Sequence, residues 1–75
     1  MELSKDIKAR LILELYEHGG RVDQDAVRDA ERGYRDYQMD YFDEWYRDRP
    51  GAGRAYVAGQ RVGRMYDIQI LKPVV

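Results

Sequence analysis

The chain has 75 residues, a net charge of −1 and no cysteine. A chain this short forms one small domain with a thin margin of stability. The lack of cysteine excludes disulfides and thiolate zinc sites, and no apolar run reaches the ~18 residues of a membrane-spanning helix. The opening residues lack an apolar signal core, so we expect a cytoplasmic protein.

Residues 4–18 are predicted to form a helix. Ser4 is a suitable N-cap, and Gly19 and Gly20 give a clear stop. Leu3, Ile7, Leu11 and Leu15 share one face of this helix, and Ala9, Ile12, Leu13 and Tyr16 lie largely on the other. Two apolar faces predict that the helix is sandwiched inside the fold or that one face meets another subunit. The second alternative predicts a homodimer.

A second helical pattern covers residues 23–48. Asp23 is a good N-cap, and Val22 and Val27 fit a hydrophobic staple around it. The apolar stripe continues through Ala30, Tyr34, Tyr37, Tyr41, Phe42 and Trp45, which are predicted to face the core. The segment is either one long helix or two helices with a break near Gly33.

The remaining residues are predicted to form a loop over 49–53 and a β-hairpin over 54–71, turning at Gly59. Tyr66, Ile68 and Ile70 alternate with polar residues, which is typical of a half-buried strand. A helical alternative places Ala55, Ala58, Val62 and Met65 on one face, but Gly59 and Gly63 argue against it. The expected fold class is therefore α+β, with two or three helices followed by a C-terminal hairpin in a single domain, residues 1–75.

Charge divides unevenly between the middle and the end of the chain. Residues 21–48 carry five arginines against nine acidic residues, whereas residues 49–75 carry four arginines and one lysine against one aspartate. The acidic part also holds the tryptophan, the phenylalanine and several tyrosines, which supply contact area at low entropic cost. This predicts a protein-binding, acidic-aromatic helix face made of Asp36, Met39, Asp40, Asp43, Glu44 and Tyr46. The alternative is a nucleic-acid site on the hairpin, using Arg54, Arg61, Arg64 and Lys72.

No catalytic, cofactor or metal motif of any specificity occurs in the sequence. His18 is the only histidine, and the last turn of a helix is a place where a cation suits the helix dipole. The run from Gly51 to Arg54 looks like half of a phosphate-binding turn, but no predicted strand precedes it, and a flexible loop is the simpler interpretation. We therefore expect a non-enzymatic protein without a cofactor.

Residues 11–27 (LILELYEHGGRVDQDAV) resemble the opening of winged helix-turn-helix domains. The resemblance implies that residues 54–71 form the wing and that the segment after Gly33 is the recognition helix. That segment carries Asp36, Asp40 and Asp43, which phosphates would repel. By class analogy alone, a small, cysteine-free, charge-dense chain is similar to phage-encoded inhibitors such as anti-CRISPR proteins. The leading hypothesis is an inhibitor or adaptor that docks on a larger protein, with a nucleic-acid-binding regulator or a homo-oligomeric structural protein as alternatives.

Overall fold

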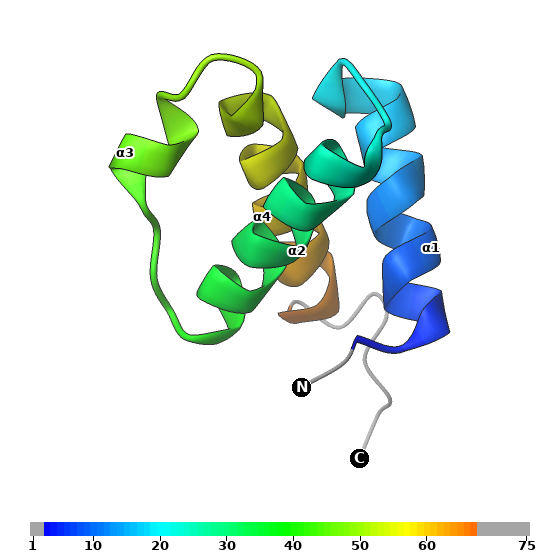
Figure 1. Cartoon of the computed structure of the whole chain (residues 1–75). Helices are drawn as coiled ribbons and strands as arrows, with labels where there is room; N and C mark the ends of the chain where they lie inside the picture. Colours follow the sequence, from blue (N-terminus) through cyan, green and yellow to red (C-terminus); the bar gives the residue numbers. More distant parts are fainter. Residues whose placement is uncertain (1–2, 68–75) are drawn as a thin grey trace.

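The computed structural model describes residues 3–67, and every regular element in that range is helical. In chain order they are α1 (Lys5–Glu14), the π-helical turn η1 (Leu15–Gly19), α2 (Gln24–Gln38), α3 (Glu44–Arg47) and α4 (Ala52–Asp67). Figure 1 shows α2 and α4 stacked against each other, α1 along one side, and α3 on the opposite side. Within residues 3–67 no helix combines the length and apolar character that crossing a membrane requires.

The first helix begins and ends where the sequence predicts. The Ser4 hydroxyl accepts a hydrogen bond from the Ile7 amide at 3.2 Å, and Gly20 closes η1 with a φ of 87°. Such a left-handed φ strains any residue with a side chain, so glycine is required there. Leu11 and Leu15 are buried in the core, whereas Tyr16 is 80% exposed. The helix is therefore covered on one apolar face and open on the other.

The second helix breaks later than the sequence indicates. Asp23 caps α2, as predicted, by accepting a hydrogen bond from the Ala26 amide at 2.8 Å. Gly33 lies inside α2, and the helix ends after Gln38. Asp40 then adopts a φ of 57°, a left-handed conformation that aspartate tolerates better than most residues. A single turn, α3, follows, with its N-cap at Asp43.

The prediction of a C-terminal hairpin is wrong. The α+β fold class and the winged-helix arrangement, which depend on that hairpin, are wrong as well. Residues 52–67 form one helix, and residues 68–71 of the predicted hairpin lie outside the described residues. The two glycines that argued against a helix are what allow it to pack. A Cβ on Gly59 would stand 1.9 Å from the Ala30 carbonyl oxygen, and one on Gly63 would stand 2.8 Å from the Tyr37 Cβ. The close approach to α2 outweighs the ~1 kcal/mol by which glycine disfavours a helix.

The core lies between α2 and α4 and is built from small residues. Ala26, Ala30, Ala55 and Ala58 are buried at this contact, with Leu11, Leu15 and Val62 around them. Gly33 completes the contact, because a Cβ there would stand 2.1 Å from the Tyr56 carbonyl oxygen. Small side chains let the two helix backbones approach closely, so packing is dense although few large aliphatic residues take part.

Candidate interaction site

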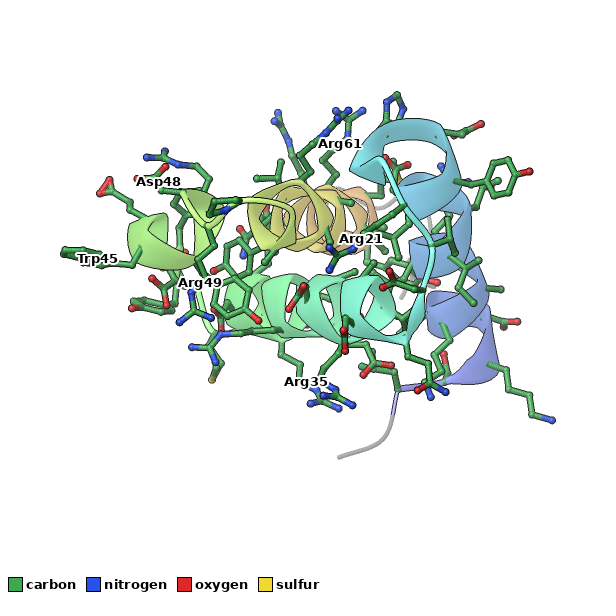
Figure 2. All side chains as sticks on the ribbon, turned by 45° about the horizontal axis from the view of Figure 1, so that its top comes forward. Arg21, Arg35, Trp45, Asp48, Arg49 and Arg61 are labelled. Atoms are coloured by element: carbon green, nitrogen blue, oxygen red, sulfur yellow. The ribbon has the colours of Figure 1, made fainter. Side chains whose placement is uncertain are left out.

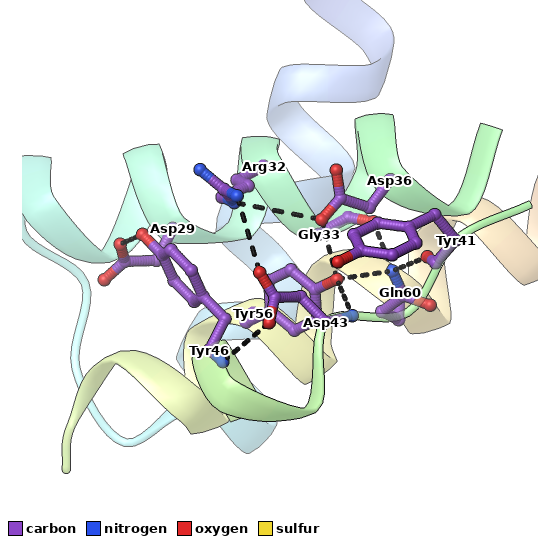
Figure 3. Close-up of polar contacts among 9 residues, drawn as sticks. All are labelled: Asp29, Arg32, Gly33, Asp36, Tyr41, Asp43, Tyr46, Tyr56 and Gln60. Carbon is purple, nitrogen blue, oxygen red and sulfur yellow. Dashed lines mark hydrogen bonds and ion pairs between the residues drawn. The ribbon is translucent and has the colours of Figure 1, made fainter. Parts of the chain in front are cut away.

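A buried tyrosine joins α4 to α2 and to the start of α3. The Tyr56 hydroxyl donates a hydrogen bond to Asp36 Oδ2 at 2.7 Å and accepts one from the Asp43 amide at 2.8 Å (Figure 3). Asp36 is only 6% exposed, and Arg32 is its ion-pair partner at 3.8 Å. A buried carboxylate requires such partners, because an unsatisfied one is costly. The hydroxyl of Tyr56 therefore satisfies Asp36 and fixes the chain at Asp43.

A second tyrosine, Tyr46 of α3, joins that helical turn to α2. The Tyr46 hydroxyl donates a hydrogen bond to Asp29 on α2, and the Tyr46 amide donates one to the Asp43 carboxylate at 3.1 Å. The Tyr46 ring lies 5.0 Å, centroid to centroid, from the Tyr56 ring. Arg21 also pairs with Asp29, at 3.6 Å. We call Asp29, Arg32, Asp36, Asp43, Tyr46 and Tyr56 the tyrosine–carboxylate network.

Both hydroxyls of the network are held in the neutral, proton-donating form. Burial, reinforced by the hydrogen bond to Asp36, raises the pKa of Tyr56 to about 12, although the hydrogen bond from the Asp43 amide opposes the shift. The hydrogen bond to Asp29, together with burial, raises the pKa of Tyr46 above its ordinary value. The two hydroxyls therefore lose their protons only at a more alkaline pH than a free tyrosine does.

The residues that precede and form α3 expose large apolar side chains. Met39, Tyr41, Phe42 and Trp45, here called the aromatic segment, all stand among the exposed large hydrophobic residues. Trp45 is 88% exposed and points away from the rest of the molecule (Figure 2). Tyr41, Phe42 and Trp45 were predicted to face the core, and this prediction is wrong. The chain leaves the helical register after Gln38, so the stripe stops there.

Arginines stack on the aromatic rings of this region. The guanidinium carbons of Arg32 and Arg49 lie 4.7 and 4.8 Å from the Tyr46 ring centroid, and that of Arg47 lies 5.4 Å from the Phe42 centroid. These cation–π contacts order the arginine side chains without using up all their hydrogen-bond donors. The arginine side chains next to the aromatic segment are therefore ordered before any partner binds.

The six residues predicted to bind a protein partner do not share one face. Met39, Asp40 and Glu44 are exposed, but Asp36, Asp43 and Tyr46 belong to the tyrosine–carboxylate network. Only the exposed three can contact a partner without disturbing α3. Asp36 is buried, and Asp43 and Tyr46 are half-buried. These three act indirectly, because they hold the exposed residues in place.

The arginines of the predicted hairpin lie on α4. Arg54, Arg61 and Arg64 are exposed there, whereas Lys72 lies outside the described residues. His18 belongs to a cluster with Glu14 and Glu17, whose nearest ligand atoms lie within 4.8 Å of one another. Arg61 and Arg10 approach the buried Glu14 carboxylate at 3.2 and 3.8 Å. These cations already balance the Glu14 charge, so the cluster is better described as an ion-pair network than as a metal centre.

No family model, curated protein or solved structure matches this chain. The analogy to phage-encoded inhibitors and anti-CRISPR proteins stays a prediction. Any functional proposal must therefore rest on the surface of the molecule.

Proposed function

We propose that this protein is a non-enzymatic interaction module that docks on a larger protein through the aromatic segment. The observation that supports the proposal is the 88% exposure of Trp45 on a helical turn that Asp29, Asp36 and Asp43 hold in place. Exposed apolar patches on small proteins mark interaction surfaces, and tryptophan and tyrosine dominate the binding energy of such surfaces.

The polar side chains around the aromatic segment suit a protein partner. Asp40 and Glu44 are exposed beside Arg47 and Arg49. An apolar centre with a polar rim of mixed charge is the common anatomy of a protein interface. The two acidic residues balance the two arginines, so this rim has no net positive charge to attract a phosphate backbone. Within this proposal the protein acts in the cytoplasm as an inhibitor or adaptor, and it performs no chemistry itself.

Rigidity supports the proposal as well. The tyrosine–carboxylate network fixes the base of the segment before any partner arrives, so binding does not have to order the chain. Preorganisation of this kind raises affinity by lowering the entropic cost of association.

The experiment is affinity capture from a lysate of the source cells, treated with nuclease, using the wild-type chain, Trp45→Ala and Tyr16→Ala. Tyr16 is the matched control, because it is an aromatic residue of similar exposure on η1. We expect the same proteins to bind the wild type and Tyr16→Ala, and to be lost with Trp45→Ala. Capture that survives Trp45→Ala, or that disappears on nuclease treatment alone, contradicts the proposal.

A second copy of the chain is the alternative partner. Ile12, Leu13 and Tyr16 form an exposed apolar face on α1 and η1, which is the observation that favours a homodimer. Light scattering at micromolar concentration distinguishes the two. A dimer mass for the wild type that becomes a monomer mass in Leu13→Glu supports self-association, whereas a monomer mass for both excludes it.

A further inference from the structure

A cleft of about 300 Å³ opens between η1, the end of α3 and the outer face of α4. Four basic side chains line it, His18, Arg47, Arg54 and Arg61, and Val57 and Ala58 contribute apolar surface between them. Figure 2 shows Arg61 at the upper edge of the molecule, where several nitrogen-tipped side chains gather. Arg54 and Arg61 are seven residues apart on α4, which places them on one side of the helix.

Close backbone contacts bring two of these arginines to the cleft. A Cβ on Gly53 would stand 1.8 Å from the Arg47 carbonyl oxygen, so the absence of a side chain there allows the end of α3 to lie against α4. Arg54 donates a hydrogen bond to the His18 carbonyl oxygen at 3.4 Å and packs over Gly20, where a Cβ would stand 3.3 Å from its Nη1. Gly53 of the Gly51-to-Arg54 run therefore lies in a close helix contact at the cleft and not in a flexible loop.

Arg61 is fixed by a buried carboxylate. Glu14 is 2% exposed, and its Oε2 lies 3.2 Å from Arg61 Nε. This contact uses the inner edge of the guanidinium, and the terminal nitrogens remain available for a ligand. Arg10 shares the same carboxylate, so Glu14 does not cancel the Arg61 charge by itself.

The cleft keeps a surplus of positive charge. Arg47 pairs with Asp48 at 3.1 Å, and Glu17 lies next to His18 at the rim. Among the described side chains of residues 3–66, no carboxylate forms an ion pair with Arg54, whose hydrogen-bond partner is a neutral carbonyl. A single carboxylate ligand needs one arginine, whereas a phosphate dianion matches several guanidinium groups with five donors each.

We propose that the basic cleft binds the phosphate group of a small ligand, through Arg54, Arg61 and Arg47, with Val57 contacting the apolar part of that ligand. The size of the cleft suits a phosphate with a modest organic substituent. This site is separate from the aromatic segment and does not depend on the proposed protein interaction.

The test is a titration with inorganic phosphate, followed by the amide resonances of the ¹⁵N-labelled chain and compared with chloride at equal ionic strength. We expect saturable shifts confined to η1, to the end of α3 and to residues 53–61 of α4. Arg54→Gln removes no ion pair and should fold normally, and it should weaken binding at least fivefold. Arg64→Gln is the matched control, because Arg64 is exposed on the same helix but does not line the cleft. The affinity of this variant for phosphate should stay within twofold of wild type.

Three results would overturn the proposal: no saturation with phosphate, shifts spread over α1 and α2, or equal losses in Arg54→Gln and Arg64→Gln. A second arm distinguishes the source of the phosphate. A nucleoside monophosphate should bind at least as tightly as inorganic phosphate, and a short oligonucleotide without terminal phosphates should not compete at physiological salt. If instead the oligonucleotide binds with a steep salt dependence and the monophosphate does not, α4 carries a nucleic-acid surface and the small-ligand site is wrong.

Discussion

The α2–α4 contact and the α3 region are held together by different interactions. Between α2 and α4, alanines and glycines bring two backbones together, and Gly59 has no room for even one further carbon. At α3, a four-residue turn buries no residue of its own. It is held by the hydrogen bond that Tyr46 donates to Asp29 and by the one that the Asp43 amide donates to the Tyr56 hydroxyl. Steric packing between α2 and α4 sets the stability of the domain. The tyrosine–carboxylate network instead determines how the aromatic segment is exposed on the surface. A substitution in one region should therefore leave the other region largely unchanged.

The largest effect is expected from Gly59→Ala at the centre of the helix contact. Helix propensity alone would make this change stabilising by about 1 kcal/mol. The new Cβ would lie 1.9 Å from the backbone oxygen of Ala30, which no side-chain rotation relieves, so we expect a loss of at least ~3 kcal/mol. Urea unfolding followed by circular dichroism measures the loss.

Gly63→Ala is the graded control for that experiment. Its new Cβ would lie 2.8 Å from the Tyr37 Cβ, a less severe overlap than the 1.9 Å approach to a backbone oxygen at Gly59. Its cost should be clearly smaller than that of Gly59→Ala. Equal costs, or no cost for either, would show that the helices are not in the close contact described.

Tyr56→Phe should weaken the α3 region without dissolving the helix contact. The change leaves Asp36 buried with Arg32 as its remaining partner, and the Asp43 amide loses its acceptor. We expect a loss of about 1–3 kcal/mol. Hydrogen exchange should rise in residues 39–48 and change little at the centres of α2 and α4. Uniform loosening of the whole chain would instead show that the Tyr56 hydroxyl stabilises the α2–α4 contact as well.

Alkaline pH should separate the two regions in the same way. The pKa of Tyr56 is raised to about 12 in the folded chain from an ordinary value of 10.0, so folding favours the neutral hydroxyl. The stabilisation is complete below pH 10 and is lost as pH rises through about 12. Melting temperature should therefore fall over this window, and it should fall less steeply in Tyr56→Phe. A parallel decline in both proteins would contradict the role of that hydroxyl.

Trp45→Ala should have the smallest effect on stability. A buried tryptophan would cost about 3–5 kcal/mol on truncation. An exposed one should change the free energy of unfolding by less than about 0.5 kcal/mol. A larger loss would show that the indole packs within the folded chain.

The sequence predicts the caps of this fold better than its contacts. Ser4, Asp23 and Gly20 act as their local chemistry indicates, because caps depend on neighbouring residues only. The role of Gly59 and Gly63 depends on a helix some 30 residues away in the chain, where local propensity disfavours a helix and tertiary packing overrides it.

The sequence misassigned which side chains of residues 36–46 are exposed, because Tyr41 and Trp45 lie outside and Asp36 lies inside. A continued helical stripe made Trp45 a core residue, and the break at Asp40 could not be distinguished from helix by periodicity alone. One usable signal was present, since seven tyrosines against one phenylalanine indicate hydroxyls with partners, and Asp29 and Asp36 lie at helical spacing to receive them. The cleft left a weaker signal, because its basic residues come from separate elements.

The most direct test of the account is the fluorescence of Trp45, the only tryptophan in the chain. The account predicts the emission of a water-exposed indole in the folded protein, quenched by acrylamide nearly as readily as in the urea-unfolded chain. It also predicts that this emission is unchanged in Tyr16→Ala. A blue-shifted emission that acrylamide reaches only after unfolding would show that Trp45 is buried, and the aromatic segment would then not be the surface that this protein presents.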